Sequence, residues 1–251
     1  MNGHRVTGTG QGNRGRWRGR SAACMIAAAL GAGVFVVPPA WAERPMAVDD
    51  AGTLDPGGAK LEAGWSRDHK ERGFDAAAGY GPVQNVELEI SLARAQDRDP
   101  DPSARLRAVG AALKWVPIQA EAGLSAGLKL SYDQTRVDPR DGSARETERA
   151  RALTGLLSWT FESGQRAHLN LGHEWIRVAG DDESGNTWGV GFEQPLTGAL
   201  TLTAEVFGVE DGAPDRQVGL RYEISEGLAL SAAVGRGSDR NIANGGIAWE
   251  F

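Results

Sequence analysis

Apolar and polar residues alternate along most of the chain from residue 59 to the C-terminus. The clearest run covers residues 86–92, where valine, leucine and isoleucine at every second position alternate with Glu87, Glu89 and Ser91. Successive side chains of a β-strand point to opposite faces, so this period predicts strands with one apolar and one polar face. We count about twelve such runs, an even number, as bacterial outer-membrane barrels have.

The connections between the predicted strands alternate in length and composition. Short connections rich in turn residues occur at 81–85, 117–119, 162–165, 195–198 and 225–227. Charged and mostly longer connections lie between them, at 97–103, 137–149, 180–185, 210–215 and 235–241. Outer-membrane barrels have short periplasmic turns and longer extracellular loops. The alternation therefore indicates a barrel rather than a soluble β-sandwich.

Aromatic residues stand at the two ends of the predicted apolar strand faces. One band consists of Tyr80, Trp115, Phe161, Phe192, Tyr222 and Phe251, and the other of Trp65, Phe74, Tyr132, Trp175 and Trp188. Two such bands are typical of the interfacial girdles of a membrane barrel. Together these patterns predict an all-β fold, a single transmembrane antiparallel up-and-down β-barrel of about 12 strands over residues 59–251.

Residues 1–42 have the organisation of a cleaved signal peptide. Five arginines and no acidic residue occupy residues 1–20, an apolar run covers 22–37, and Ala40-Trp41-Ala42 offers small residues for cleavage before Glu43. The apolar run is shorter than the roughly 20 residues that a helix needs to span a bilayer. We therefore expect export into the periplasm and no membrane helix.

The last strand ends on Ile247, Trp249 and Phe251, which share one face. This ending resembles the C-terminal sorting signal of Gram-negative outer-membrane proteins, a terminal phenylalanine with apolar residues two and four positions earlier. The resemblance implies recognition by the barrel-assembly machinery and localisation in the cell outer membrane.

Charge and cysteine content narrow the possible partners. The chain has 27 basic and 33 acidic residues. Removing the five arginines of the signal peptide leaves 22 against 33, a net charge of −11. Binding to nucleic acid needs a basic face, so we exclude nucleic acid as a partner. Cys24 is the only cysteine, so the mature chain has neither disulfides nor thiolate metal sites.

A leader of residues 43–58 separates the signal peptide from the first strand. It contains Arg44-Pro45, the run 49–53 (Asp-Asp-Ala-Gly-Thr) and Gly57-Gly58, and the first strand follows with 61–65 (Leu-Glu-Ala-Gly-Trp). This series, with 110–115, resembles the outer-membrane proteins grouped with the meta-pathway of phenol degradation. The resemblance implies a channel or transport barrel for small, often aromatic, compounds. The leader itself is either a disordered periplasmic segment or a plug inside the lumen.

The polar faces of the strands predict the lining of the lumen. The inward positions that carry charge are Glu62, Asp75, Glu87, Glu89, Lys114, Lys129, Asp133, Glu174, Glu193, Glu205, Arg221 and Glu223. Rings of acidic side chains favour cations, so the acidic excess predicts a cation-favouring lumen. Inward glycines such as Gly79, Gly189 and Gly191 leave room inside. Pairing between these acids and bases would instead give a closed lumen.

The preferred function is an outer-membrane channel or transport barrel for a small solute, in contact with outer-membrane lipid and lipopolysaccharide. Barrels of about eight strands are filled by their own side chains and those of about sixteen hold a channel, so twelve strands allow either a pore or a plug. A non-conducting structural or adhesive barrel is the alternative, and a lipid-modifying barrel enzyme is a minor one.

Candidate residues for catalysis are few. Ser158 and His168 are expected to share the inward face of adjacent strands, and His173 to point outward; both histidines are interpreted as ordinary lining or surface residues rather than parts of a catalytic site. The five-residue spacing of the two histidines places them on opposite faces, which argues against a shared metal. The acidic run 181–183 is interpreted as a solvated loop. We expect no enzymatic activity, no metal and no cofactor.

Overall fold

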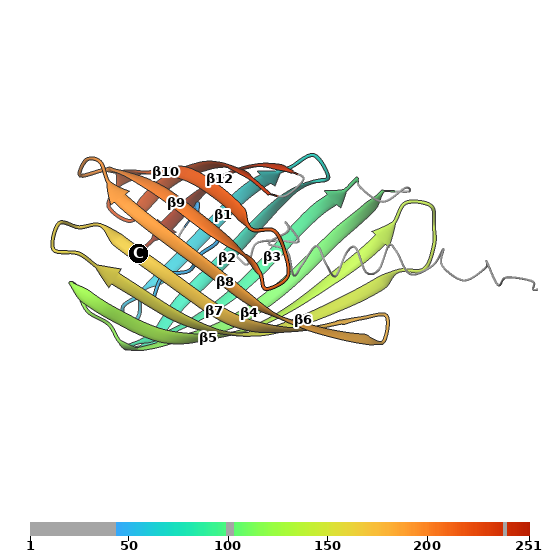
Figure 1. Cartoon of the computed structure of the whole chain (residues 1–251), viewed down its shortest axis with the longest axis horizontal. Helices are drawn as coiled ribbons and strands as arrows, with labels where there is room; N and C mark the ends of the chain where they lie inside the picture. The colour runs from blue at the N-terminus through green and yellow to red at the C-terminus, as the bar shows by residue number, and fades with distance from the viewer. Residues whose placement is uncertain (1–43, 99–102, 238–239) are drawn as a thin grey trace, which may run out of the picture.

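A closed barrel of antiparallel strands forms the protein (Figure 1). The structure is a computed structural model that describes residues 44–98, 103–237 and 240–251; the signal-peptide prediction lies outside them. Within these residues the strands are β1 (Ala59–Arg67), β2 (Glu71–Val83), β3 (Val86–Asp97), β4 (Ala104–Ile118), β5 (Gly123–Pro139), β6 (Glu146–Thr160), β7 (Arg166–Val178), β8 (Asp181–Pro195), β9 (Leu200–Val209), β10 (Asp215–Ser225), β11 (Leu228–Arg236) and β12 (Asn241–Glu250). Each strand pairs with its sequence neighbours, so the predicted all-β, up-and-down barrel of 12 strands is confirmed. Among the described residues no helix is long and apolar enough to cross a membrane.

The barrel closes between its first and last strands. β1 and β12 pair in antiparallel register from Lys60 with Glu250 to Arg67 with Ala243. Phe251 continues this pairing, because its N–H donates to the carbonyl of Ala59 at 2.9 Å and its carbonyl accepts from the N–H of Ala59 at 2.8 Å. Closure of the sheet lets neighbouring strands satisfy one another's backbone groups, as a wall in contact with lipid requires.

The outer face carries a continuous set of exposed apolar side chains. Phe74, Ile90, Leu92 and Val234 are more than 60% exposed, and similar residues occur on every strand. Soluble monomers rarely expose contiguous apolar patches larger than several hundred Å². A barrel with this outer face and a polar inner face is suited to lipid.

Ile90 offers a test of this outer face. It lies midway along β3 between Val86, which pairs with Trp115 of one aromatic band, and Arg94, which pairs with Phe74 of the other. We expect Ile90→Arg to lower the free energy of unfolding in lipid vesicles by about 2–4 kcal/mol, as charges do at the middle of a bilayer. Urea titration measures the free energy of unfolding. Ser143→Arg, in the exposed turn after β5, is the control for adding an arginine away from the lipid-facing surface. Equal stability of the two variants would contradict a lipid-facing surface.

The predicted loop at 180–185 is shorter in the structure than in the sequence interpretation. β7 and β8 continue to a tight turn at Ala179 and Gly180, both with positive φ (51° and 96°), as the turn of a two-residue hairpin requires. The acidic run 181–183 therefore lies at the start of β8 and not in a loop, although it is exposed as expected. Arg177 pairs with Asp182 across this hairpin at 2.9 Å, which stabilises the extended strands.

Candidate functional site

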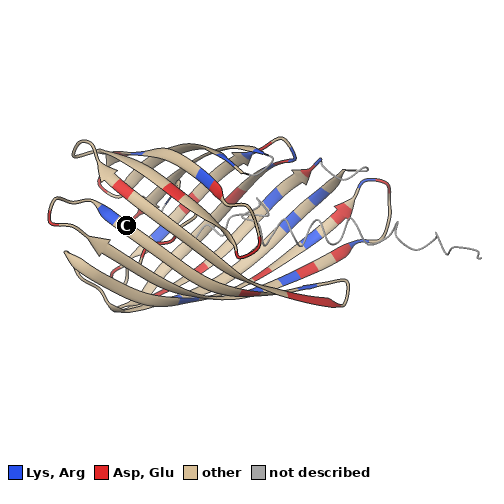
Figure 2. Cartoon of the chain, viewed as in Figure 1, with Lys and Arg blue, Asp and Glu red and all other residues tan. Residues whose placement is uncertain are grey.

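The interior of the barrel is lined by polar and charged residues, as the inward positions of the strands require. Nine acids and bases of the predicted set are buried on the described wall: Glu62, Asp75, Glu87, Glu89, Lys114, Lys129, Glu193, Glu205 and Arg221. Asp133 and Glu174 are partly buried, while Glu223 is exposed where the register of β10 shifts near its end. Charged positions are frequent toward the end of the barrel away from the C-terminus (Figure 2).

Residues 44–58, here called the lumen segment, lie inside the barrel. Arg44, Pro45, Met46, Val48, Asp49, Ala51 and Leu54 contact wall residues of strands on all sides of the lumen, from β10 through β8 and β6 to β2. The segment ends in a turn at residues 55–58, in which the N–H of Gly58 donates to the carbonyl of Asp55 at 2.9 Å. Pro56 and Gly57, with φ of +89°, suit this turn, and β1 begins directly after it.

Asp49 is the most firmly held residue of the lumen segment. Lys114 Nζ donates to one carboxylate oxygen at 2.8 Å and Lys129 Nζ to the other at 2.6 Å. Asn170 exchanges two hydrogen bonds with the Asp49 backbone, at 2.7 and 2.8 Å. Lys114 and Lys129 are directly opposite on β4 and β5. Two like charges in this arrangement repel, so the carboxylate between them stabilises the wall as well as the segment.

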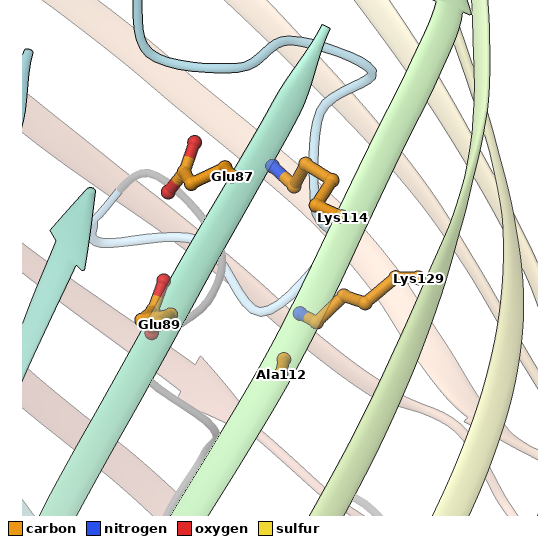
Figure 3. A pocket seen from close by; sticks show the side chains of 5 residues that line it. All are labelled: Glu87, Glu89, Ala112, Lys114 and Lys129. Atoms are coloured by element: carbon orange, nitrogen blue, oxygen red, sulfur yellow. The ribbon is translucent and has the colours of Figure 1, made fainter. Parts of the chain in front are cut away.

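Neighbouring groups extend the network around Asp49. Asp50 accepts from Lys114 at 3.1 Å and lies 4.0 Å from Arg166. Glu87 and Glu89 of β3 lie beside Lys114 and Lys129, and together with Ala112 they line a cavity of about 10 Å³ (Figure 3). A cavity of this size holds about one water molecule.

Backbone N–H groups of the lumen segment are satisfied by the wall. Glu205 accepts from Ala47 at 2.9 Å and from Val48 at 2.7 Å. Ser158 Oγ accepts from Ala51 at 2.7 Å, and Glu87 accepts from Leu54 at 3.1 Å. A segment without regular structure would otherwise bury unpaired donors, which is costly. The wall thus supplies a specific partner at several points along the segment.

Glycines of the wall make room for the lumen segment. At Gly189 a Cβ would lie 2.7 Å from Val48, at Gly219 it would lie 2.6 Å from Pro45, and at Gly191 it would overlap Met46. Other lumen glycines, such as Gly110 and Gly172, face wall side chains instead. The space that inward glycines leave is therefore in part already filled, by residues of the same chain.

Inward apolar residues complete the fit, and the sequence analysis did not identify them. Phe207 packs against Met46 and Val48, and Val116 and Leu156 pack against Ala51. In a barrel wall these residues occupy positions where polar side chains are expected. An apolar residue on the polar face of a strand was thus the available sequence signal for a contact inside the lumen.

The basic residues of the lumen were also underestimated from sequence. Arg44 pairs with Glu62 at 3.6 Å and with Asp75. Lys60 lies 3.7, 3.5 and 3.9 Å from Glu62, Glu87 and Glu89. Arg44 comes from the region assigned to the leader and Lys60 from the start of the first strand, and the sequence analysis includes neither among the inward residues. They offset a large part of the acidic excess in this half of the lumen.

Ser158, His168 and Glu193 form a hydrogen-bonded chain on the inner wall. Ser158 Oγ and His168 Nδ1 are 2.8 Å apart, and His168 Nε2 and Glu193 Oε1 are 3.1 Å apart. Glu193 also pairs with Arg166 and Arg221. The lumen segment covers the hydroxyl through the N–H of Ala51, so the chain serves as an anchor for the segment here. His173 points elsewhere and contacts Asn186 on the exposed side.

Comparison with known proteins places the chain among outer-membrane barrels by fold. The family model described as "Uncharacterised conserved protein UCP029691" matches residues 32–248. The KdgM porin in complex with disordered oligogalacturonate is 11% identical, with a TM-score of 0.55 over 76% of this chain and 99% of that one. The translocator domain of the autotransporter NalP from Neisseria meningitidis is 10% identical, with a TM-score of 0.54 over 78% and 88%. The NanC porin is 10% identical, with a TM-score of 0.52 over 76% and 98%. No curated protein matches the chain.

Proposed function

The chain belongs to the family described as uncharacterised conserved protein UCP029691, and we propose that it is an outer-membrane transport barrel for a small solute, closed by its own lumen segment. The observation that carries this proposal is which part of the chain occupies the interior of the barrel. The interior is occupied by residues 44–58, a separate stretch of chain, and not only by side chains of the wall. A filling of this kind can move without unfolding the barrel.

The outer membrane is the proposed location because of the outer face of the barrel. Its exposed apolar side chains, bounded by aromatic residues such as Trp65, Tyr80 and Trp115, suit a bilayer. Export by the predicted signal peptide and recognition of Ile247, Trp249 and Phe251 by the assembly machinery belong to the same proposal. The resemblance to the meta-pathway family adds aromatic compounds as candidate solutes.

A structural barrel without a pore is the second candidate, and one observation favours it. Most charged side chains near the lumen segment are paired, as Asp49 is by two lysines and Glu193 by two arginines. Such pairing stiffens the interior. A structural barrel, however, has no need of wall glycines at Gly189, Gly191 and Gly219, since larger side chains would fill the lumen directly.

The open lumen is proposed to favour cations. Release of the lumen segment removes Arg44 from Glu62 and Asp75 and two N–H donors from Glu205, so these acids face the passage. Further along the lumen, Glu148 is buried with one carboxylate oxygen, Oε2, that lacks a hydrogen-bond partner. Carboxylates in a narrow passage of low dielectric constant focus a negative potential.

Single-channel recording in planar bilayers tests the transport proposal. We expect the unchanged protein to stay closed for most of the time and the double variant Arg44→Ala, Asp49→Asn to conduct steadily. The variant loses the ion pairs of Arg44 with Glu62 and Asp75 and those of Asp49 with its two lysines. The matched control is Asp141→Asn, which removes an exposed acid outside the barrel interior. Absence of conductance in the double variant, with a normally folded barrel, would favour the structural alternative.

Reversal potentials in asymmetric salt test the ion preference of the conducting variant. We expect selectivity for cations, and a weaker selectivity after Glu87→Gln and Glu89→Gln, because these acids face the cavity of Figure 3. The fold should persist, since glutamine is close to isosteric with glutamate. Selectivity for anions, or an unchanged reversal potential in the glutamine variant, would contradict a cation-favouring lumen.

A further inference from the structure

The guanidinium group of Arg44 lies in a slot whose floor is made of glycine. Gly64 of β1 pairs with Gly246 of β12 on one side and with Asp75 of β2 on the other, so the three residues form a row across three strands. A Cβ at Gly64 would lie 2.7 Å from Arg44 Nη2, and one at Gly246 would lie 2.8 Å from Arg44 Cδ. Both distances are shorter than Cβ atoms tolerate. Glycine at position 64 therefore makes room for the guanidinium, and glycine at position 246 makes room for Cδ of Arg44 and for the carbonyl of Ala63.

Two buried carboxylates form the charged side of the slot. The side chain of Glu62 is 0% exposed and that of Asp75 is 4% exposed. The ion pair of Asp75 is with Arg44. Lys60, the wall base near Glu62, lies within 4 Å of Glu87 and Glu89 as well. Burying a carboxylate is costly unless a cation compensates it. When Arg44 leaves, buried Asp75 loses this ion pair, and another cation in the slot would compensate its charge.

The site of Asp49 differs in this respect. The lysines that hold Asp49 line the same cavity as Glu87 and Glu89 (Figure 3). The wall thus brings its own counter-charges to Lys114 and Lys129 when the lumen segment moves away. In the slot, by contrast, Asp75 of the wall is paired with a base of the lumen segment.

We infer that this slot is a binding site for a guanidinium group of the transported solute, and that Arg44 occupies it as an internal competitor while the lumen is closed. The inference rests on the transport function proposed above. A guanidinium is planar and presents several N–H donors in a fixed fork, whereas an ammonium group is a compact point charge. In this slot Arg44 donates to Asp75, and its Nε lies 3.6 Å from Glu62. A solute that takes the slot displaces Arg44 and weakens the hold on the lumen segment, so binding and opening are coupled.

Agmatine and putrescine provide the direct test. Agmatine carries a guanidinium and an amine, and putrescine carries an amine at each end, so the pair separates guanidinium recognition from charge alone. Calorimetric titration of the full-length protein in detergent should detect agmatine binding that is about tenfold tighter in Arg44→Ala than in the unchanged protein, because the competitor is gone. Putrescine should bind much more weakly to both.

Variants of the slot in the Arg44→Ala background locate the binding site. Gly64→Ala places a methyl group where the guanidinium lies, and Asp75→Asn removes its carboxylate partner, so each should abolish agmatine binding. Gly155→Ala is the matched control, since the nearest atom to its Cβ would be 3.6 Å away and the residue is far from Arg44. Heat-modifiable gel mobility verifies that each variant is folded. If one of the two slot variants fails to fold, the other still tests the binding site.

The outcomes separate this inference from the transport function. A barrel that conducts but binds agmatine no better than putrescine, or binds it equally after Gly64→Ala and Asp75→Asn, would overturn the guanidinium site and leave transport standing. Binding that follows the expected pattern in a barrel that never conducts would support the site and refute transport instead.

Discussion

Changing Phe251 to serine is expected to remove most of the folded protein from the outer membrane. Its ring is 61% exposed at the rim and stacks on Trp249 with ring centroids 4.6 Å apart. Serine keeps the backbone hydrogen bonds between Phe251 and Ala59 that close the barrel. Loss of the ring contacts alone costs about 1.5–3 kcal/mol at most, which is small beside a typical stability of about 5–15 kcal/mol. A large loss therefore indicates failed recognition during assembly.

Tyr222→Ser is the matched control for this experiment. Tyr222 is 52% exposed and lies near the same end of the barrel, on β10, but it is not part of the C-terminal pattern. Heat-modifiable mobility of outer-membrane fractions measures the folded amount of each variant. If Phe251→Ser and Tyr222→Ser lower it equally, the C-terminal residues act only as lipid-facing aromatics and the assembly-signal hypothesis is wrong.

The barrel could be predicted from sequence because the patterns that indicate its strands lie within short stretches of the chain. Alternation within a strand, as in residues 86–92, and aromatic residues at strand ends are each visible within one short window. Antiparallel neighbours then follow from short turns such as 84–85, where Asn85 has the positive φ that the turn requires. The lengths of the outer hairpins were less predictable, since charged residues such as 181–183 can lie in an exposed strand as well as in a loop.

The position of the lumen segment could not be predicted in the same way. Its contacts join residues far apart in the chain, such as Val48 with Glu205 and Pro45 with Gln217. The sequence allows the leader to lie either in the periplasm or in the lumen, because contacts between residues so far apart are not visible in a short stretch of sequence. Several features were nevertheless visible: paired acids at 49–50, inward lysines at 114 and 129, and inward glycines. Each is ordinary alone, and only their juxtaposition in three dimensions makes a site.

The leader motif gains a physical explanation from these contacts. Arg44 lies in the glycine slot, Pro45 packs on Gly219, and Asp49 is held by two lysines. Gly57 and Gly58 form the turn that delivers the chain from the lumen into β1. The residues that carry the resemblance to the meta-pathway family are thus largely those that fix the lumen segment to the wall. This link favours a role for the segment in the proposed transport function.

Replacing Gly189 and Gly191 by valine is expected to expel the lumen segment. Cβ atoms at these positions would meet Val48 and Met46, which are both buried against Phe207. Losing the burial of two such side chains costs roughly 3–6 kcal/mol, and every 1.4 kcal/mol is about tenfold in population. A thiol introduced by Ala51→Cys, a site only 3% exposed, reports the released population. Its reaction with maleimide, in a Cys24→Ala background, should become roughly a hundredfold faster.

Gly155→Val separates expulsion from a general effect of adding valine to the wall. Gly155 lies between Leu153 and Leu157 on the outward face of β6, where a Cβ would come no closer than 3.6 Å to its nearest neighbour. The Ala51→Cys thiol should therefore react with maleimide as slowly in the Gly155→Val variant as in the protein with the unchanged wall. If Gly189→Val and Gly191→Val leave the Ala51→Cys thiol equally protected, the segment is not seated on these glycines. Persistence of protection would assign the closure to the polar contacts of the segment, such as those of Arg44 with Asp75 and of Asp49 with its two lysines.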